Sequence, residues 1–200
     1  MSIQSDAKPI TISDEVAAST TFIAAAAQPT TAFTLANTSF ASGGARILQV
    51  TTTGTGDNGK TVTIVGTDTH GNSISEVITS TGSAESVSGT KYFLTVVSAT
   101  CSAQYAANVS VGMTAGAAQA IFAGRTRLKS TSIVSGGTAG VVSFYDGTPE
   151  DGTVLFKART IGTDNATVNM NIPDEGALFA DGAAVQYTVG TVDMMTFFYA

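Results

Sequence analysis

Few residues of this sequence could do chemistry, and none has an activating group at a suitable spacing. His70 is the only histidine of the 200-residue chain and lies in the run Asp68-Thr69-His70-Gly71-Asn72. A histidine titrates near neutral pH and acts as a general base when another group orients its ring. No second group near His70 in the sequence can do so. We therefore expect a solvated turn residue at this position.

Acidic and amide side chains gather in four short stretches where they could offer oxygen ligands to calcium. These are Asp57-Asn58-Gly59, Asp68 with Asn72, residues 146–151, and Asp164-Asn165. None of the four matches the twelve-residue EF-hand pattern. Asp and Asn also favour turns by bonding their own backbone. We therefore predict turns at these stretches and no metal site.

Cys101 is the only cysteine, which excludes an intrachain disulfide and a zinc site built from cysteines. It follows the apolar run of residues 92–97, and we expect it to be a small buried hydrophobe. The GxSxG nucleophile motif and the phosphate-binding GxxxxGK[ST] motif are absent from the sequence. The sequence predicts no catalytic, cofactor-binding or metal-binding residue, and thus a protein that is not an enzyme.

The chain is poor in charge, since only 12% of its residues are charged, about half the usual share. The nine basic and fifteen acidic residues give a net charge of −6. This balance argues against a nucleic-acid partner or an anionic membrane, because both require a basic patch. The basic cluster Arg125, Arg127 and Lys129 alternates along one predicted strand and indicates a solvated face. A neutral, hydroxyl-rich surface favours lasting contact with other subunits.

The first residues, MSIQSDAKPITI, lack the basic end and apolar core of a signal peptide. No run of eighteen apolar residues could span a bilayer. These patterns predict a protein made in a cytoplasm, which acts there or is carried in an assembled particle.

The stretch Lys60–Ser80 is the clearest β-hairpin signal in the sequence. Val62 and Ile64 alternate with threonines, Ile74 and Ile78 alternate with polar residues, and turn formers separate the two runs. Residues 22–27 could be a helix by the propensity of their alanines, but the Pro29 that follows favours a strand. We expect further strands at residues 32–36, 46–53, 90–99, 108–113, 127–134, 141–145, 153–159, 166–173, 177–180, 184–189 and 192–199. Residues 112–124 consist mainly of small residues and are predicted to be a linker.

Short strands separated by Gly and Asp turns predict an all-β protein with two small antiparallel β-sandwich or barrel domains. We expect the first domain at residues 21–122 and the second at residues 123–200. Residues 1–20 are predicted to be an extended N-terminal arm, in which the ITI pattern after Pro9 could pair as an edge strand. A short helix could begin at Ser13.

Large apolar side chains occur at the end of the sequence, namely Met194, Met195, Phe197, Phe198 and Tyr199. Domains usually fray at their ends, so these side chains need a cover. We expect a final strand inside the second sheet. The alternative is an aromatic strip that is partly buried against a neighbouring subunit.

Two passages resemble segments of tailed-bacteriophage virion proteins. TVTIVGTDTHGNSISEVIT followed by GTKYFLTVVSAT is similar to a recurring pattern of strand, G-T-D-x-x-G-N turn and strand in small virion proteins. VVSFYDGTPEDGTVLFKARTIG and the terminal aromatic strand resemble β-sandwich modules of capsid-attached proteins. Together the two passages and their surroundings cover about three quarters of the chain.

The resemblance implies a capsid decoration or cement protein, bound outside the major capsid protein lattice and often a homotrimer. The expected function is therefore structural: stabilisation of a phage capsid by bridging capsomers, with the protein located in the virion after synthesis in the host cytoplasm. The alternatives are a structural protein of the tail, head-tail connector or fibre base, and a module on the virion that binds glycans.

Overall fold

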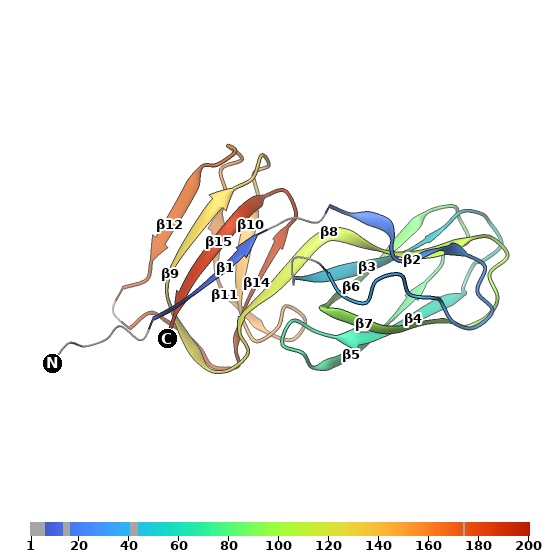
Figure 1. Ribbon diagram of the computed structural model, residues 1–200, viewed down its shortest axis with the longest axis horizontal. Helices are drawn as coiled ribbons and strands as arrows, with labels where there is room; N and C mark the ends of the chain where they lie inside the picture. The colour runs from blue at the N-terminus through green and yellow to red at the C-terminus, as the bar shows by residue number, and fades with distance from the viewer. Residues whose placement is uncertain (1–6, 14–16, 41–43, 174) are drawn as a thin grey trace. The chain divides into compact units, whose positions relative to one another are not determined.

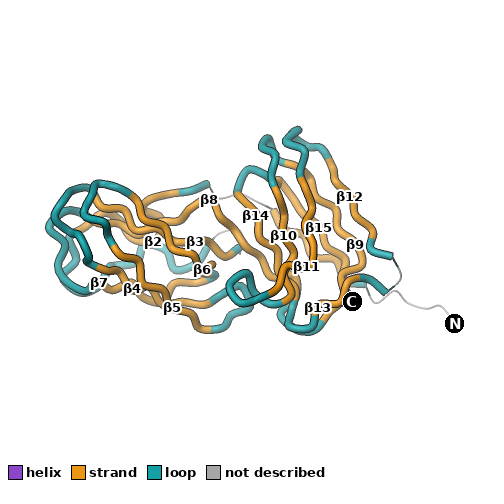
Figure 2. The backbone as a smooth tube through the Cα atoms, turned by 180° about the vertical axis from the view of Figure 1, so that it is seen from behind, coloured by secondary structure: helices purple, strands orange, loops and turns teal. Residues whose placement is uncertain are grey.

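The computed structural model describes residues 7–13, 17–40, 44–173 and 175–200 (Figure 1). These residues form strands, turns and loops and contain no helix (Figure 2). The predicted all-β class is confirmed. The chain divides into two compact units, which we call the central unit (Val16–Ala117) and the terminal unit (Met1–Glu15 with Ala118–Ala200).

One layer of the terminal unit is an antiparallel sheet in the order β1-β15-β9-β12, with β13 also paired to β9. Figure 1 shows β1, β15, β9 and β12 side by side. The second layer contains β11, β10 and β14, and the sheet order continues from β14 to β8. The bounds are β1 Lys8–Ser13, β8 Val109–Phe122, β9 Thr126–Ser135, β10 Val141–Asp146, β11 Thr153–Arg159, β12 Thr167–Asn171, β13 Ala177–Phe179, β14 Ala183–Thr188 and β15 Val192–Tyr199.

Aromatic rings join the two layers of the terminal unit into a sandwich. Phe144 of β10 stacks on Phe156 of β11, with ring centroids 4.3 Å apart. Phe144 also contacts Phe197 of β15 in a T-shaped arrangement, with ring centroids 5.8 Å apart. Because Phe144 and Phe197 are fully buried, this contact between the layers lies in the core.

The central unit contains β2 Ser19–Ala27, β3 Ala45–Thr52, β4 Thr61–Thr67, β5 Ser73–Thr79, β6 Ser86–Phe93 and β7 Thr95–Cys101. The strands β4, β5 and β7 form one sheet, while β3 lies between β6 and β8 in the other. The predicted hairpin is confirmed, because β4 pairs with β5 from Thr61↔Thr79 to Thr67↔Ser73. Val62 and Ile64 are fully buried, as their alternation predicts.

Three predictions for the middle of the chain are wrong. Residues 90–99 are not one strand, because the chain leaves the sheet of β3 at Leu94 and joins that of β4. Residues 32–36 make an isolated bridge at Ala32 instead of a strand. Residues 112–122 are not a linker but the larger part of β8. Gly112 belongs there because a Cβ atom would collide with the main chain of Ser19 and Thr20 on β2.

Part of the predicted N-terminal arm is an integral strand. Residues 8–13 form β1, which pairs with β15 at the edge of its sheet, and Ile12 is buried. The alternation of the ITI pattern explains this pairing, since it directs Ile12 into the core. Residues 1–6 and 14–16 lie outside the described residues. Ser13, where a short helix was considered to begin, is instead the last residue of β1.

Candidate functional site

His70 lies in the turn between β4 and β5, and no residue in the described ranges orients its ring by a hydrogen bond. Its main-chain N–H donates to Asp68 Oδ1 at 2.8 Å, as does the N–H of Asn72. Asn72 Nδ2 donates to the other oxygen of Asp68 at 3.0 Å. The His70 Nε2 atom is buried and makes no hydrogen bond to any described residue. Asp68 therefore holds the turn together through main-chain and Asn72 contacts, and it makes no bond to the imidazole.

Asp57 is the centre of a second polar cluster and is fully buried. Its carboxylate accepts hydrogen bonds from Lys60 Nζ at 2.7 Å and from the N–H groups of Ala106 at 2.7 Å and Ala107 at 3.2 Å. Burial alone would raise the pKa of Asp57, but these donors together hold the pKa below its ordinary value of 3.8. Asp57 thus ties the 54–60 turn to the loop that precedes β8.

Tyr105 lies beside this cluster, with its ring 5.5 Å from Lys60 Nζ. Its hydroxyl is 3.0 Å from Ser80 Oγ, and burial raises the pKa of Tyr105 above 10.0. A lysine, a tyrosine and a serine could serve acid-base chemistry in an open cleft. Tyr105 and Ser80, however, are almost completely buried. We therefore assign this cluster to the architecture of the central unit.

Glu76 joins the two sheets of the central unit. From β5 it accepts hydrogen bonds from the N–H of Thr90 at 2.7 Å, the hydroxyl of Thr90 at 3.0 Å and the N–H of Lys91 at 3.4 Å. These two residues belong to β6. Gly89 allows the contact, because a Cβ atom there would collide with the Glu76 carboxylate.

Other charged residues considered in the sequence also bond to neighbouring parts of the chain. Asp146 Oδ1 accepts the N–H of Asp181 at 2.7 Å. Arg127 forms an ion pair with Glu175 at 3.2 Å, and Lys129 Nζ donates to the main-chain oxygen of Glu175 at 2.7 Å. The described residues contain no group of three or more His, Cys, Asp or Glu side chains that could hold a metal ion.

Cys101 is half-buried, rather than a buried hydrophobe as predicted. Its Sγ atom lies 3.5 Å from the main-chain oxygen of Pro29. Cys101, at the end of β7, therefore packs partly buried against the hydrophobic core of the central unit, and its thiol contacts a carbonyl.

The outer face of the β1-β15-β9-β12 sheet is the surface whose composition stands out. Where all four strands pair, the register places twelve side chains on this outer side in three rows of four, and we call these twelve residues the neutral face. The rows are Ser13, Met194, Val134 and Thr167; Thr11, Thr196, Ser132 and Asn169; and Pro9, Phe198, Ser130 and Asn171. None of these twelve residues is charged.

The neutral face combines exposed apolar groups with open polar groups. Met194 is 42% exposed and Phe198 is 38% exposed. The side chains of Ser130, Ser132 and Asn169 make no hydrogen bond within the described part of the chain, whereas Thr11 and Thr196 bond each other at 3.1 Å. The face can therefore offer both apolar contact and hydrogen bonds to a partner.

The same strands build the core on their other face. The inner rows contain Ile12, Met195, Ile133 and Val168, and then Ile10, Phe197, Thr131 and Met170. Met195 and Phe197 are fully buried, which confirms the final strand that was predicted inside the sheet. Burial of the inner row holds the outer row in place, because a slip of one residue would exchange the two faces.

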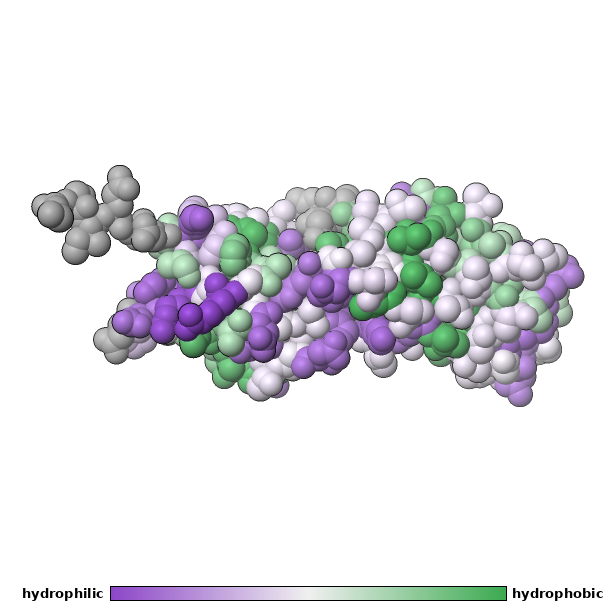
Figure 3. Space-filling model, turned by 90° about the horizontal axis from the view of Figure 1, so that it is seen from below, coloured by the Kyte–Doolittle hydropathy of each residue, from purple (hydrophilic) through white to green (hydrophobic). Residues whose placement is uncertain are grey.

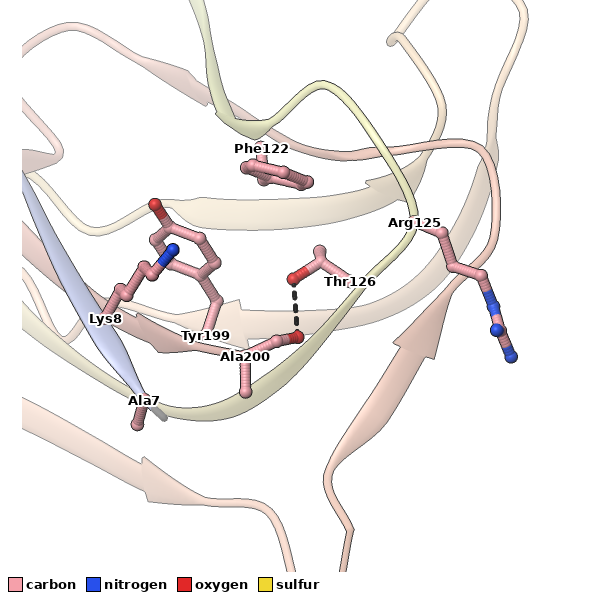
Figure 4. Close-up of a pocket in the computed structure, with 7 residues that line it drawn as sticks. All are labelled: Ala7, Lys8, Phe122, Arg125, Thr126, Tyr199 and Ala200. Atoms are coloured by element: carbon pink, nitrogen blue, oxygen red, sulfur yellow. Dashed lines mark hydrogen bonds between the residues drawn. The ribbon is translucent and has the colours of Figure 1, made fainter. Parts of the chain in front are cut away.

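A pocket of about 490 Å³ lies where the inner face ends, beyond the core rows (Figure 4). The rings of Phe122 and Tyr199 form one wall with centroids 5.5 Å apart. Figure 4 shows Lys8 alongside Tyr199, while the Arg125 side chain points away from both rings. The Thr126 hydroxyl donates to the main-chain oxygen of Ala200 at 3.0 Å. The pocket thus offers two rings and one amine but no convergent catalytic set.

Comparisons with protein-family models, with curated proteins and with solved structures found no match. No helix in the described ranges is long and apolar enough to cross a membrane. Most of the surface in Figure 3 is pale, the colour of intermediate hydropathy, with purple and green residues interspersed. The neutral face is therefore the candidate site on its own geometry and composition.

Sequence reasoning did not find the neutral face, although part of its signal is visible in the sequence. Asn169 and Asn171 alternate with apolar residues, and so do Ser130 and Ser132 with the buried Thr131 and Ile133. Each run alone predicts only that one side of a single strand faces solvent. The face appears when β1 is aligned with β15, and this pairing joins the two ends of the described chain.

Proposed function

We propose that this protein is a non-enzymatic structural component of a tailed-phage virion, which binds the outer capsid lattice and stabilises it by bridging capsomers. The observation that carries the proposal is the neutral face. A protein surface without charge can be covered by a partner without stripping water from an ion, a step that costs several kcal/mol per ion. Its open hydroxyl and amide groups then hydrogen-bond to the partner.

The proposed partner is the major capsid protein, and the proposed form is a homo-oligomer, with a trimer favoured by the resemblance to phage virion proteins. The G-T-D-x-x-G-N turn of that resemblance is the Asp68 turn, whose hydrogen bonds are internal. Arg127 and Lys129 are engaged with the turn at Glu175. This engagement supports a partner other than nucleic acid.

The test is binding of the purified protein to empty capsids of the phage that encodes it, followed by cryo-electron microscopy. We expect density at positions fixed by the capsid lattice, with the neutral face against the coat. Ser132→Lys places a charge at the centre of this face and should abolish binding. Val97→Lys places the same charge on an exposed side chain of β7 and should bind normally. Density confined to the tail or connector, or absence from virions, would contradict the proposal.

A second candidate function is glycan binding. Phe198 is exposed on the neutral face in the same row as Asn171, and sugar rings pack on aromatic side chains while amides bond their hydroxyls. A glycan array probed with the assembled protein and with Phe198→Ala distinguishes the two functions. A signal that Phe198→Ala removes would favour the glycan, whereas no signal with either protein would argue against it.

A further inference from the structure

The edge strands of the three sheets differ in how they are protected. An unprotected edge presents unpaired main-chain groups, and proteins guard such edges with charge, proline, bulges or a covering segment. In the β1-β15-β9-β12 sheet, β1 carries Lys8 and Pro9. β12, with the sequence TVNMN, carries neither charge nor proline, and it pairs with β9 without a register shift.

The other edges that end the sheet orders are guarded. β11 contains Lys157 and Arg159 and has an irregular register with β10. β5 carries Glu76, and this carboxylate also accepts two N–H groups of β6. Main-chain hydrogen bonds from the 31–39 segment cover β7. Among these six edges in the described ranges, β12 is the one without protection.

The main-chain groups of β12 that face its open side can be identified. Ala166 O accepts the N–H of Ser135, and Ile172 N–H donates to Lys129 O. In an antiparallel pair, residues alternate between facing their partner and facing away. The even-numbered residues from 166 to 172 therefore face β9. The N–H and C=O groups of Thr167, Asn169 and Asn171 face the open edge.

We propose that two copies of this chain pair antiparallel through β12, about a two-fold axis at Asn169. Asn169 then faces Asn169 of the partner subunit, and Thr167 faces Asn171 of the partner subunit. Each of these hydrogen-bonded pairs exchanges two main-chain bonds, so the contact contains six. Such an isologous contact closes at two copies.

The side chains of β12 fit this register. On the inner side, Val168 packs against Met170 of the partner subunit, and both residues are half-buried in one copy. A largely apolar cavity of about 270 Å³ lies beside Met170, lined also by Phe156 and Ile172. On the outer side, only Thr and Asn side chains meet. Because β12 is uncharged, two chains of net charge −6 can pair there without opposing like charges in the strand.

Pairing of β12 has a consequence for the neutral face. The two β1-β15-β9-β12 sheets become one continuous sheet, and the two neutral faces become continuous. One face has a footprint of about 19 by 17 Å, small for a stable interface of about 800 Å² per partner. Pairing doubles this footprint, but the pairing itself does not depend on the proposed function.

The test is the mass of the purified protein in solution across a dilution series. We expect the wild type to be a dimer of the 20.2 kDa chain or, where the trimer favoured above also forms, a hexamer in which two trimers are joined through β12. Asn169→Pro removes an N–H that faces the open edge and leaves the bonds to β9 in place, so it should halve the mass. Ser132→Lys, one strand inward on the same face, should leave the mass unchanged even where capsid binding is lost.

Disulfide trapping keeps the proposal testable if Asn169→Pro does not fold. In a Cys101→Ala background, Asn169→Cys should cross-link two copies on oxidation, because facing Cα atoms lie about 5.5 Å apart. Thr167→Cys should not, since its nearest copy lies four residues away, about 14 Å along the strand. A monomeric wild type, a trimer that Asn169→Pro leaves intact, or equal cross-linking by both cysteine variants would overturn the proposal.

Discussion

Two groups of polar side chains, one in each unit, differ in what they bind. In the central unit, the carboxylates of Asp57, Asp68 and Glu76 accept hydrogen bonds from main-chain N–H groups of turns, loops or strands. In the terminal unit, Ser132 and Asn169 on the neutral face make no side-chain hydrogen bond within the described residues. The first group holds the fold together, and the second is available to a partner. Residue type alone therefore does not identify a site.

Buried and exposed polar side chains differ in what it costs to leave them without a hydrogen bond inside the protein. A buried carboxylate without partners costs several kcal/mol, so Asp57 must be satisfied within the chain. An exposed serine or asparagine is satisfied by water, so it can exchange water for a partner at little cost. The polar groups that are open and regularly spaced are the ones to test for function.

The largest effect on stability is expected in the hydrophobic core of the central unit. Ile64→Asp places a charge at a fully buried position of β4 and should lower the free energy of unfolding of the central unit by about 4 kcal/mol. Chemical denaturation followed by circular dichroism measures the change. Val77→Asp, on an exposed position of the paired strand β5, is the control and should change little. Equal losses in the two variants would contradict the assigned faces.

Asp57→Asn should destabilise the central unit by about 2 to 3 kcal/mol at neutral pH, because Lys60 loses its buried counter-charge. In the wild type, the folded-state pKa of Asp57 lies below the ordinary 3.8. This stabilisation is therefore full above pH 3.8 and is lost as the pH falls through the lower folded value. Denaturation midpoints measured from pH 6 downward should fall less steeply for Asp57→Asn. Parallel curves would show that Asp57 is not the group that titrates.

Glu76→Ala should cost about 1 to 2 kcal/mol, because it removes the acceptor that joins β5 to β6. Gly89→Ala should cost a similar amount by displacing the carboxylate. The double variant should lose less than the sum of the single losses, since the collision is gone once Glu76 is removed. Strict additivity in denaturant unfolding would mean that the two sites are independent.

The smallest expected effect lies on the neutral face. Ser132→Lys should change the free energy of unfolding by no more than about 0.5 kcal/mol, because the Ser132 side chain has no hydrogen bond to a described residue to lose. The same denaturation experiment measures it, with Ser130→Lys as a second position in the neighbouring row. If both variants lost more than about 1 kcal/mol of unfolding free energy, the side chains of this face would be packed against other parts of the same chain.

Local patterns predict most of the strands. The predicted ranges 153–159 and 192–199 coincide with β11 and β15, because period-two alternation between Gly or Asp turns is a local property of a strand. The hairpin at Lys60–Ser80 is correct for the same reason. The prediction at residues 90–99 failed because apolar residues continue through Leu94, where the chain changes sheets.

Two further features depend on contacts that no local pattern contains. The small residues of β8 have the composition of a linker, but Gly112 and Gly116 are small because β2 and Ile47 approach them closely. The neutral face requires the register of β1 on β15, between residues far apart in the sequence. The absence of catalytic residues, the phage particle and its capsid partner were predicted from the sequence, and they remain predictions.

The pairing of β1 with β15 also sets the order in which the chain can fold during synthesis. The Thr11–Thr196 contact spans 185 residues, so at about 5 to 20 residues per second the β1 segment waits roughly 10 to 40 s for its partner strand. The central unit, continuous in sequence, can form during that interval. Until then, the β1 segment is a single strand in a crowded cell, and Lys8 and Pro9 then protect it against wrong pairing.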